Sequence, residues 1–475
     1  MYNMENLFKK ERNMKYFKLT AVTLLFAVLL ISCGVSSEIV PEYDVTSDTT
    51  DFYGTTFNWG FSMHRYASST DNVFGYKPDT NFADMALERL KDVEKRFNCT
   101  INIDNNSSSY VIGDRLNVSL KTGVHLYDIA TCDTGILSSI VRAGGYLAGL
   151  SNLLDVKNTA KFGRPNMLQM MLWKDDLYGV VPCAWPLLVS SRIGHVLAIN
   201  ETLVARLGET DPREYVENST WTWDKFEEVL EAFTYKEGER TVYGLSSHDA
   251  YFAMNMFLSN GVTFSEYVDG KVVFGAYTDA GREALERAAS IYNVTCKPFI
   301  YPDASTTDHF RDGSSVMCGY FLDGVINTLM YEMENAGIIP FPQGPKATPG
   351  VYPTYYEEFT YATVIPANAI DTSASAAIID AMFEPFKGLE TRDDMIDYLT
   401  SQVFFDPRDS AVFLGAVEYT EYGFFWEGGR SGIEQCIRTL KPVSEALEGL
   451  ENVYDKLVEE YLVPHYNGRI AVYGE

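Results

Sequence analysis

Short apolar segments alternate with amphipathic segments in the part of the chain that follows residue 50. Residues 55–61 (TTFNWGF) predict a strand, and residues 100–103 (TINI) predict another. Between them, residues 81–97 predict a helix, because apolar side chains recur at spacings of three and four positions: Phe82, Ala86, Leu90, Val93 and Phe97. A helix ending near Gly123, a strand at 127–131 and a helix through 137–147 continue the alternation. This order predicts a doubly wound α/β fold.

The pattern changes further along the chain. Residues 262–268 and 271–277 flank Asp269-Gly270, a dipeptide that favours a two-residue hairpin turn, so the predicted sheet structure is not purely parallel. Apolar residues recur at helical spacing after residue 222 and predict a helix that Thr222 can cap. Its apolar face comprises Phe226, Val229, Leu230 and Phe233. The last third of the chain is mostly helical in pattern.

The N-terminal segment has the organisation of an export signal. Lys15 and Lys18 precede the apolar run 19–31, which is shorter than the roughly 20 residues that span a bilayer as a helix. The run ends in Leu-Ile-Ser-Cys, which resembles the bacterial lipobox, whose cysteine receives a lipid and becomes the first mature residue. We therefore expect a lipoprotein signal peptide at 1–32, starting at Met1 or, more simply, at Met14, lipidation of Cys33, and a flexible tether at 33–50.

Composition narrows the possible partners. The chain has 475 residues, of which 46% are hydrophobic, so it can bury the core of two or three domains. Its 65 acidic and 38 basic residues give a net charge of −27, which argues against binding to nucleic acids or to anionic lipid surfaces. The six cysteines after Cys33 form no Cys-x-x-Cys pair and are too sparse for a disulfide framework, so we expect most of them to be buried hydrophobic residues.

Signatures of catalysis are mostly absent. The sequence has no Gly-rich phosphate loop, no His-Glu-x-x-His and no Gly-x-Ser-x-Gly, and its six histidines lack metal-ligand spacing. Lys121-Thr122-Gly123 matches one element of the penicillin-recognising enzymes, but no Ser-x-x-Lys accompanies it, and Gly123 fits an ordinary helix C-cap. The sequence therefore implies no cofactor and no metal, and it predicts that the protein is not an enzyme.

Six segments in a fixed order carry a family resemblance. They are 174–182 (KDDLYGVVP), 197–200 (LAIN), 222–230 (TWDKFEEVL), 310–320 (FRDGSSVMCGY), 337–345 (GIIPFPQGP), and Trp426 with 443–447 (VSEAL). Together they resemble the extracellular solute-binding proteins of ABC importers, in particular the carbohydrate-binding family that includes maltose-binding protein. The resemblance covers about residues 51–460.

The resemblance implies a two-lobed, type II periplasmic-binding-protein-like α/β clamshell with a helical C-terminal part, hinged near 180–186 and 337–341. Lobe 1 would comprise 51–185 and 338–400, and lobe 2 would comprise 186–337 and 401–475. It also implies a monomer that captures a small solute, a mono- or oligosaccharide, and delivers it to ABC permease subunits. Such a lipoprotein would be anchored to the outer face of the cytoplasmic membrane, on the periplasmic side in a two-membrane bacterium.

Candidate ligand residues follow from the position of the cleft in this family, at the carboxyl ends of strands and beside the hinges. They are His64, Arg65, Asp133, Trp185, Tyr320 and Trp426. Aromatic rings can cover the apolar face of a sugar, while charged groups bind its hydroxyls. Core packing is the alternative for each aromatic ring. At the level of the whole protein, a secreted carbohydrate-active hydrolase and a surface adhesin remain alternatives to the solute-binding protein.

Overall fold

The computed structural model describes residues 50–63, 73–186, 194–298, 306–330, 332–333, 335–356, 360–423, 429–438 and 441–474. The chain divides into the units Met1–Asp48 and Thr49–Glu475, and all of the described helices and strands belong to the second unit. The predicted signal peptide, Cys33 and all but the last residue of the predicted tether lie outside the described residues, as do His64, Arg65 and Trp426.

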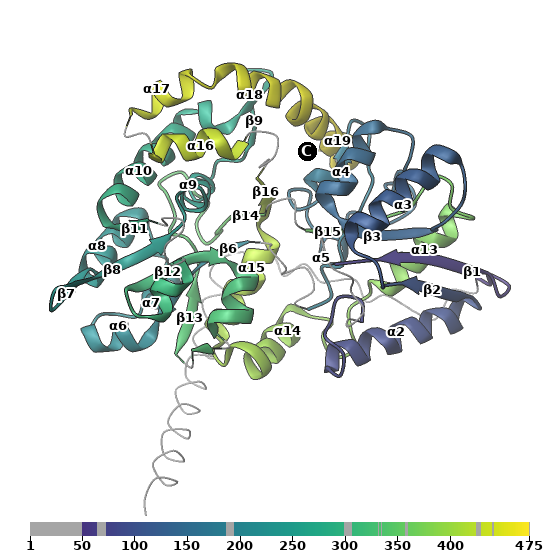
Figure 1. Ribbon diagram of the computed structural model, residues 1–475, viewed down its shortest axis with the longest axis horizontal. Helices are drawn as coiled ribbons and strands as arrows, with labels where there is room; N and C mark the ends of the chain where they lie inside the picture. The colour runs from purple at the N-terminus through teal and green to yellow at the C-terminus, as the bar shows by residue number, and fades with distance from the viewer. Residues whose placement is uncertain are drawn as a thin grey trace, which may run out of the picture. The chain divides into compact units, whose positions relative to one another are not determined.

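Four strands form the first sheet, in the order β15-β3-β1-β2. They are β1 (Thr56–Phe61), β2 (Thr100–Asp104), β3 (Ile129–Asp133) and β15 (Tyr361–Val364). β1 is parallel to β2 and to β3, whereas β15 is antiparallel to β3. Helices α2 (Asn81–Phe97) and α3 (Ser109–Thr122) connect the parallel strands, α4 (Thr134–Ala143) follows β3, and α3 and α4 lie on the opposite side of the sheet from α2 (Figure 1). The predicted alternation of strands and helices is confirmed here.

Helix α2 forms where its pattern predicts it. The hydroxyl of Thr80 accepts a hydrogen bond from the backbone N–H of Ala83, and Asn98 ends the helix in the left-handed conformation. Of the predicted apolar face, four side chains are buried and Leu90 is half-buried. The helix therefore covers the sheet with the face that its spacing indicates.

Two predicted boundaries near β3 were wrong. The strand predicted at 127–131 runs two residues later, because the buried carboxylate of Asp128 binds the backbone N–H groups of Asn58 (2.8 Å) and Ile370 (2.9 Å) just before the strand begins. The helix predicted through residue 147 already ends at Ala143, because Gly144 and Gly145 have φ angles of 73° and 72°. Sequence spacing alone does not reveal either feature.

The second sheet is mixed, in the order β11-β8-β12-β6-β13, with β7 paired to β8. Its strands are β6 (His195–Asn200), β7 (Tyr235–Glu237), β8 (Arg240–Ser247), β11 (Cys296–Pro298), β12 (Ser315–Phe321) and β13 (Ala336–Ile339). β8 is parallel to β11 and β12, whereas β6 is antiparallel to β12 and β13. Helices α8 (Trp223–Phe233), α9 (Asp249–Leu258) and α10 (Asp279–Thr295) pack beside this sheet.

Two local predictions in this region are confirmed. Thr222 caps α8 by accepting a hydrogen bond from Lys225 N–H, and the four predicted apolar residues of α8 are buried. Strands β9 (Ser265–Val268) and β10 (Lys271–Phe274) form the predicted hairpin, although each strand is shorter than its predicted range. Asp269 and Gly270 have φ angles of 50° and 80°, as a two-residue hairpin turn of this type requires.

The last third of the chain is mostly helical, as predicted. Its helices are α13 (Thr372–Met382), α14 (Arg392–Leu399), α15 (Pro407–Glu418), α16 (Gly429–Arg438), α17 (Val443–Glu448), α18 (Glu451–Leu457) and α19 (Val463–Tyr473). α16 packs against α9 and α10 beside the second sheet, whereas α19 packs against the hairpin of β4 (Leu172–Trp173) and β5 (Asp176–Leu177). The C-terminal helices therefore contact chain segments that are far apart in sequence.

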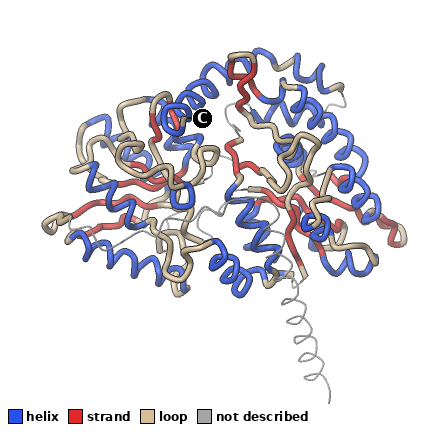
Figure 2. The backbone as a smooth tube through the Cα atoms, turned by 180° about the vertical axis from the view of Figure 1, so that it is seen from behind, coloured by secondary structure: helices blue, strands red, loops and turns tan. Residues whose placement is uncertain are grey.

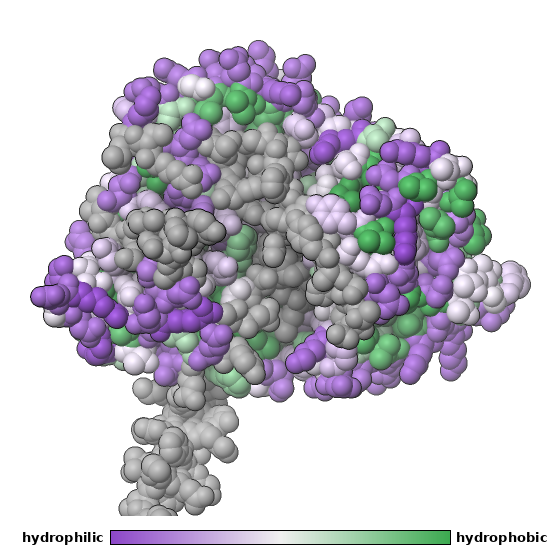
Figure 3. Space-filling model, in the orientation of Figure 1, coloured by the Kyte–Doolittle hydropathy of each residue, from purple (hydrophilic) through white to green (hydrophobic). Residues whose placement is uncertain are grey.

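Short elements complete the described chain. β14 (Thr354–Tyr356) and β16 (Thr420–Tyr422) pair in parallel to form a separate two-stranded sheet. The shorter helical elements are α5 (Thr159–Phe162), η1 (Gln169–Met171), α6 (Glu201–Leu207), α7 (Pro212–Glu217), η2 (Gly275–Tyr277), α11 (Thr306–Arg311), α12 (Leu322–Gly324), η3 (Val325–Met330), η4 (Thr400–Phe404) and η5 (Val458–Leu462). Seen from behind, the strands fall into two main groups with helices around them (Figure 2). Hydrophilic residues predominate at the left, upper and lower edges of the described surface in the view of Figure 3.

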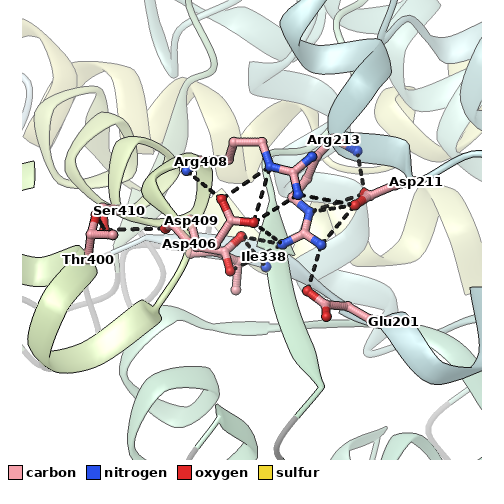
Figure 4. Close-up of polar contacts among 9 residues, drawn as sticks. All are labelled: Glu201, Asp211, Arg213, Ile338, Thr400, Asp406, Arg408, Asp409 and Ser410. Carbon is pink, nitrogen blue, oxygen red and sulfur yellow. Dashed lines mark hydrogen bonds and ion pairs between the residues drawn. The ribbon is translucent and has the colours of Figure 1, made fainter. Parts of the chain in front are cut away.

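A buried cluster of charges joins α15 to the second sheet (Figure 4). Arg213 on α7 is 3% exposed and forms ion pairs with Glu201 (2.6 Å), Asp211 (2.8 Å), Asp409 (3.2 Å) and Asp406 (3.4 Å). The two aspartates at 406 and 409 belong to the start of α15, so a single guanidinium connects four acidic groups from three parts of the chain.

The same cluster fixes the backbone of β13. One carboxylate oxygen of Asp409 accepts a hydrogen bond from Ile338 N–H at 3.0 Å. Gly337 leaves room for the guanidinium, since a Cβ atom there would lie 2.6 Å from Nη1 of Arg213. Burial raises the pKa of Asp409 to about 7; the positive charge of Arg213 opposes this rise, and the Asp406 carboxylate adds to it.

Candidate functional site

Aromatic rings gather where β8 and β12 reach their carboxyl ends in the second sheet. His195 and Phe321 are opposite each other in the register of β6 and β12, with ring centroids 4.1 Å apart. Tyr355 of β14 stacks on His195 at 4.5 Å with an interplanar angle of 13°, and Tyr251 of α9 lies 4.8 Å from His195 and 4.7 Å from Phe321. With His248 and Tyr320, which contact Tyr251 and Phe321, these residues form what we call the aromatic cluster: His195, His248, Tyr251, Tyr320, Phe321 and Tyr355.

Strand ends and a helix start hold the cluster in place. β8 ends at Ser247, and the next residue, His248, caps α9 by accepting a hydrogen bond from Ala250 N–H, which places Tyr251 in the first turn of the helix. The hydroxyl of Thr354 accepts a hydrogen bond from His195 N–H at 2.6 Å and lies 3.0 Å from the side-chain oxygen of Asn255. These contacts fix the start of β6 against β14.

The cluster has a buried base and an accessible rim. His195 and Tyr355 are buried, whereas the other four residues are half-buried. Half-buried rings on a fixed base present apolar ring faces together with phenol and imidazole groups that can form hydrogen bonds. This combination suits a ligand with an apolar face and a polar edge.

The first sheet ends in a buried carboxylate at its own carboxyl edge. Asp133 is the last residue of β3 and is fully buried, and its Oδ1 accepts a hydrogen bond from Gly135 N–H at 2.9 Å at the start of α4. Thr134 N–H donates to the carbonyl of Thr360, just before β15. At the neighbouring end of β1, Ser62 N–H donates to the carbonyl of Thr131. Asp133 therefore lies where parallel strands of this sheet end together, as predicted.

The structure also places two further candidates from the sequence. Tyr320 is half-buried and belongs to the aromatic cluster. Trp185 is 1% exposed, and its indole N–H donates to the carbonyl of Glu384 at 3.2 Å. Its ring contacts Phe74, Tyr76, Phe383 and Phe386 at centroid distances of 4.9 to 6.2 Å. Trp185 is thus enclosed by other rings and does not join the aromatic cluster.

Sequence reasoning missed most of the cluster. Five of its six members were not candidates, and the two histidines among them were treated as scattered residues; the five are His195, His248, Tyr251, Phe321 and Tyr355. For His248 a signal was present: it directly follows an apolar strand, which is the rule that selected Asp133. Tyr355 carries no such signal, since it lies in a strand of three buried residues without alternation.

Metal sites and membrane-spanning helices are absent from the described residues. Within these ranges, no group of three or more His, Cys, Asp or Glu side chains could hold a metal ion. No helix of the described part of the chain has the length and apolar character needed to cross a membrane. Cys99, Cys132, Cys318 and Cys436 are buried free thiols, as expected, and Cys183 is a half-buried one.

Comparisons with known proteins bear on the fold. No protein-family model matches the chain, and no curated protein matches it by sequence. Among solved structures, the chain is similar to a sugar transporter from Rhizobium etli in an open conformation, with a TM-score of 0.61 and 15% identity over 84% of this chain and 99% of the other. It is also similar to a cyclo/maltodextrin-binding protein complexed with maltotetraose, with a TM-score of 0.58 and 12% identity over 85% of this chain and 97% of the other.

A third structure supports the same assignment. The maltose-binding periplasmic protein from Listeria monocytogenes, in complex with maltose, has a TM-score of 0.56 and 13% identity over 86% of this chain and 99% of its own length. Each match covers nearly the whole of the other protein, so the likeness extends over both main sheets. At these identities the likeness is one of fold. The chain therefore has the two-lobed, periplasmic-binding-protein-like α/β fold of sugar-binding proteins.

Proposed function

We propose that the protein captures a carbohydrate between the parts built on its two sheets and delivers it unchanged to an ABC importer. The observation that carries this proposal is the aromatic cluster at the carboxyl ends of β8 and β12. Proteins of the same fold have been solved in complex with maltose and with maltotetraose, which supports a sugar as the ligand. These similar proteins are binding proteins, which supports binding without catalysis.

The rings account for part of the affinity expected of such a site. Tyr251, Tyr320 and Phe321 are half-buried and could each cover about 60 Å² of sugar, which corresponds to about 1.5 kcal/mol per ring. Three rings then contribute about 4.5 kcal/mol, compared with about 8 kcal/mol for a micromolar site. Hydrogen bonds and the exclusion of water on closure have to provide the difference.

We propose Asp133 as a ligand from the first sheet, because a carboxylate can accept hydrogen bonds from two adjacent hydroxyls, and this role requires its buried carboxylate to become accessible in another conformation. His64, Arg65 and Trp426 stay predictions, since they lie outside the described residues. A role for Trp185 also stays a prediction, and it would require its enclosed ring to become accessible in another conformation.

We further propose that the two lobes are discontinuous, with 51–185 and 338–400 in lobe 1 and 186–337 and 401–475 in lobe 2. In support, β1, β2, β3 and β15 of the first sheet all belong to the first set of residues. All strands of the second sheet belong to the second set, except that β13 extends two residues beyond it. α19 packs on the β4–β5 hairpin of the first set, so the C-terminal helix would connect the lobes.

We also propose that Cys33 is acylated after removal of residues 1–32 and that it holds the protein on the outer face of the cytoplasmic membrane. Intact mass measurement of protein extracted from membranes tests this: we expect a chain that begins at Cys33 and carries a diacylglyceryl group. A chain that begins at another residue, or that lacks the lipid, would contradict the anchor.

The sugar proposal is tested by titration calorimetry of the mature protein against a panel of mono- and oligosaccharides. The variants are Tyr251→Ala and Phe321→Ala, with Tyr110→Ala on α3 as the matched control, because Tyr110 is 41% exposed on an element of the first sheet. We expect at least one sugar to bind, about a tenfold weaker affinity in each cluster variant, and no change in the control. Equal affinity in all four proteins would contradict the assignment of the site.

Product analysis on the same mixtures separates the alternatives. Binding without turnover agrees with a solute-binding protein, whereas release of shorter sugars would identify a hydrolase. If no sugar of the panel binds to the protein, the sugar-binding proposal fails, and a surface adhesin becomes the better hypothesis.

A further inference from the structure

A cavity of about 300 Å³ lies beside strand β16. Its walls come from the loop after α5, the loop after α9, the segment before β14, the start of β16, and α19. The lining residues that matter here are Arg164, Glu418, Glu421 and Arg469. The volume corresponds to about ten water molecules, so a small organic molecule fits it.

The positive charges of the arginines that line this cavity are not all compensated by carboxylates. Arg164 forms an ion pair with Glu418, which also pairs with Arg392 at 3.0 Å. Nη1 of Arg469 donates to the side-chain oxygen of Asn166 at 2.6 Å, and no carboxylate of the described residues forms an ion pair with this guanidinium. Nε of Arg469 is buried without a hydrogen-bond partner among the described residues. Donor capacity and positive charge are therefore left over at Arg469.

The carboxyl group of Glu421 does not remove this charge at neutral pH. Glu421 is 3% exposed, and its Oε1 accepts a hydrogen bond from Phe264 N–H at 2.8 Å. Burial raises its pKa to about 8; the bond from Phe264 and the charge of Arg469 act against this rise, and Glu266 on β9 adds to it. Glu421 is thus mostly a neutral carboxylic acid at pH 7, and its O–H can donate.

The charges of the lining side chains favour an anion over a cation. With Glu421 neutral, the lining side chains carry two guanidinium charges and one carboxylate charge, which leaves a net charge of +1. In a chain of net charge −27, a cavity with excess positive charge and unused donors selects against cations.

We propose that this cavity is a second binding site, for a small organic carboxylate, separate from the aromatic cluster. The ligand's carboxylate lies at Arg469 and accepts hydrogen bonds from the guanidinium and from the acid O–H of Glu421. An uncharged isostere of the ligand loses the charge-assisted part of this recognition. The site does not depend on whether the protein binds a sugar.

The arrangement makes carboxylate binding depend on pH. The charged groups that face Glu421 are Arg469 on α19 and Glu266 on β9. Once Glu421 ionises, its charge compensates Arg469 and repels the ligand, so binding needs the protonated form. The affinity then falls by about tenfold for each pH unit above the pKa of Glu421.

Titration calorimetry with acetate on the mature protein at pH 6.5 and pH 9.5, without sugar, tests the proposal. We expect one acetate site at pH 6.5, an affinity at least tenfold weaker at pH 9.5, and much weaker binding of acetamide at both pH values. Acetamide binding as tightly as acetate, or no acetate binding up to 100 mM at pH 6.5, overturns the proposal.

Three variants locate the site. We expect Arg469→Gln to weaken acetate binding at least tenfold, and Glu421→Gln to remove the pH dependence while retaining binding at pH 9.5. The control Arg240→Gln, whose Arg240 guanidinium donates to the carbonyl of Asp312 in another region, should bind like the wild type. If Arg469→Gln does not fold, the pH series of Glu421→Gln decides: an unchanged pH dependence overturns the proposal.

Discussion

At the residue scale, two buried ionisable groups make the free energy of unfolding depend on pH. The pKa of Glu421 is raised to about 8 by burial, and that of His465, which lies against Trp173 and 2.5 Å from the carbonyl of Leu172, is lowered to about 4 by burial. Each shift keeps the side chain neutral inside the protein. The free energy of unfolding therefore falls with rising pH because of Glu421, and it falls with falling pH because of His465.

We predict that Glu421→Gln makes the protein more stable than the wild type in weakly alkaline solution. Between pH 4.5 and about 8 the folded state binds more protons at Glu421 than the unfolded state, so this group's contribution is present below pH 4.5 and is lost as the pH rises towards 8. The free energy of unfolding, measured with urea at pH 5 and pH 8.5, should therefore fall less in the variant than in the wild type. Glu228→Gln, at a 65% exposed side chain, serves as the control and should follow the wild type.

We predict that Trp185→Ala lowers the free energy of unfolding by about 3–5 kcal/mol, because it empties the space between Phe74, Tyr76, Phe383 and Phe386. Urea unfolding measures this loss. Sugar titration of the folded variant then tests the sequence prediction for Trp185. Unchanged sugar affinity would show that the ring only packs in the core, whereas lost affinity would support its role as a ligand.

At the element scale, the sequence predicts the elements whose local signals agree with their packing. α2 and α8 each combine a threonine cap with an apolar stripe, so the residues that start the helix and those that bury it are visible in the sequence. β14 and β16 have three residues each, all buried, and gain their partners from distant parts of the chain. Of the candidate site, Asp133 and Tyr320 follow from strand ends, whereas Tyr355 depends on the pairing of β14 and could not be found.

The charge cluster around Arg213 is another feature that depends on long-range contacts. We predict that Arg213→Ala lowers the free energy of unfolding by about 3–5 kcal/mol, because it leaves the buried carboxylate of Asp409 without its positive partner. Arg206→Ala is the matched control, since Arg206 is 51% exposed and pairs with the exposed Glu237 at 3.2 Å, so its loss should be below about 1 kcal/mol. Similar losses in both variants, measured by urea unfolding, would show that the cluster adds no more than a surface pair.

At the scale of the whole molecule, the proposed site has its contributors on two sheets. The aromatic cluster belongs to the carboxyl edge of the second sheet and to β14, and Asp133 to the carboxyl edge of the first. A single solute that contacts both would be held from two sides, and a protein of the same fold is known in an open conformation. Binding energy from both sides then favours the closed state.

We therefore predict that a sugar identified by calorimetry reduces the radius of gyration of the mature protein in small-angle X-ray scattering. Phe321→Ala should shift the midpoint of this change to about tenfold higher sugar concentration, because it removes a contact on the second sheet, and Tyr110→Ala should leave the midpoint unchanged. The result separates two forms of binding. A saturating sugar that leaves the radius unchanged would contradict closure around the sugar, and it would favour a site confined to one sheet, without Asp133.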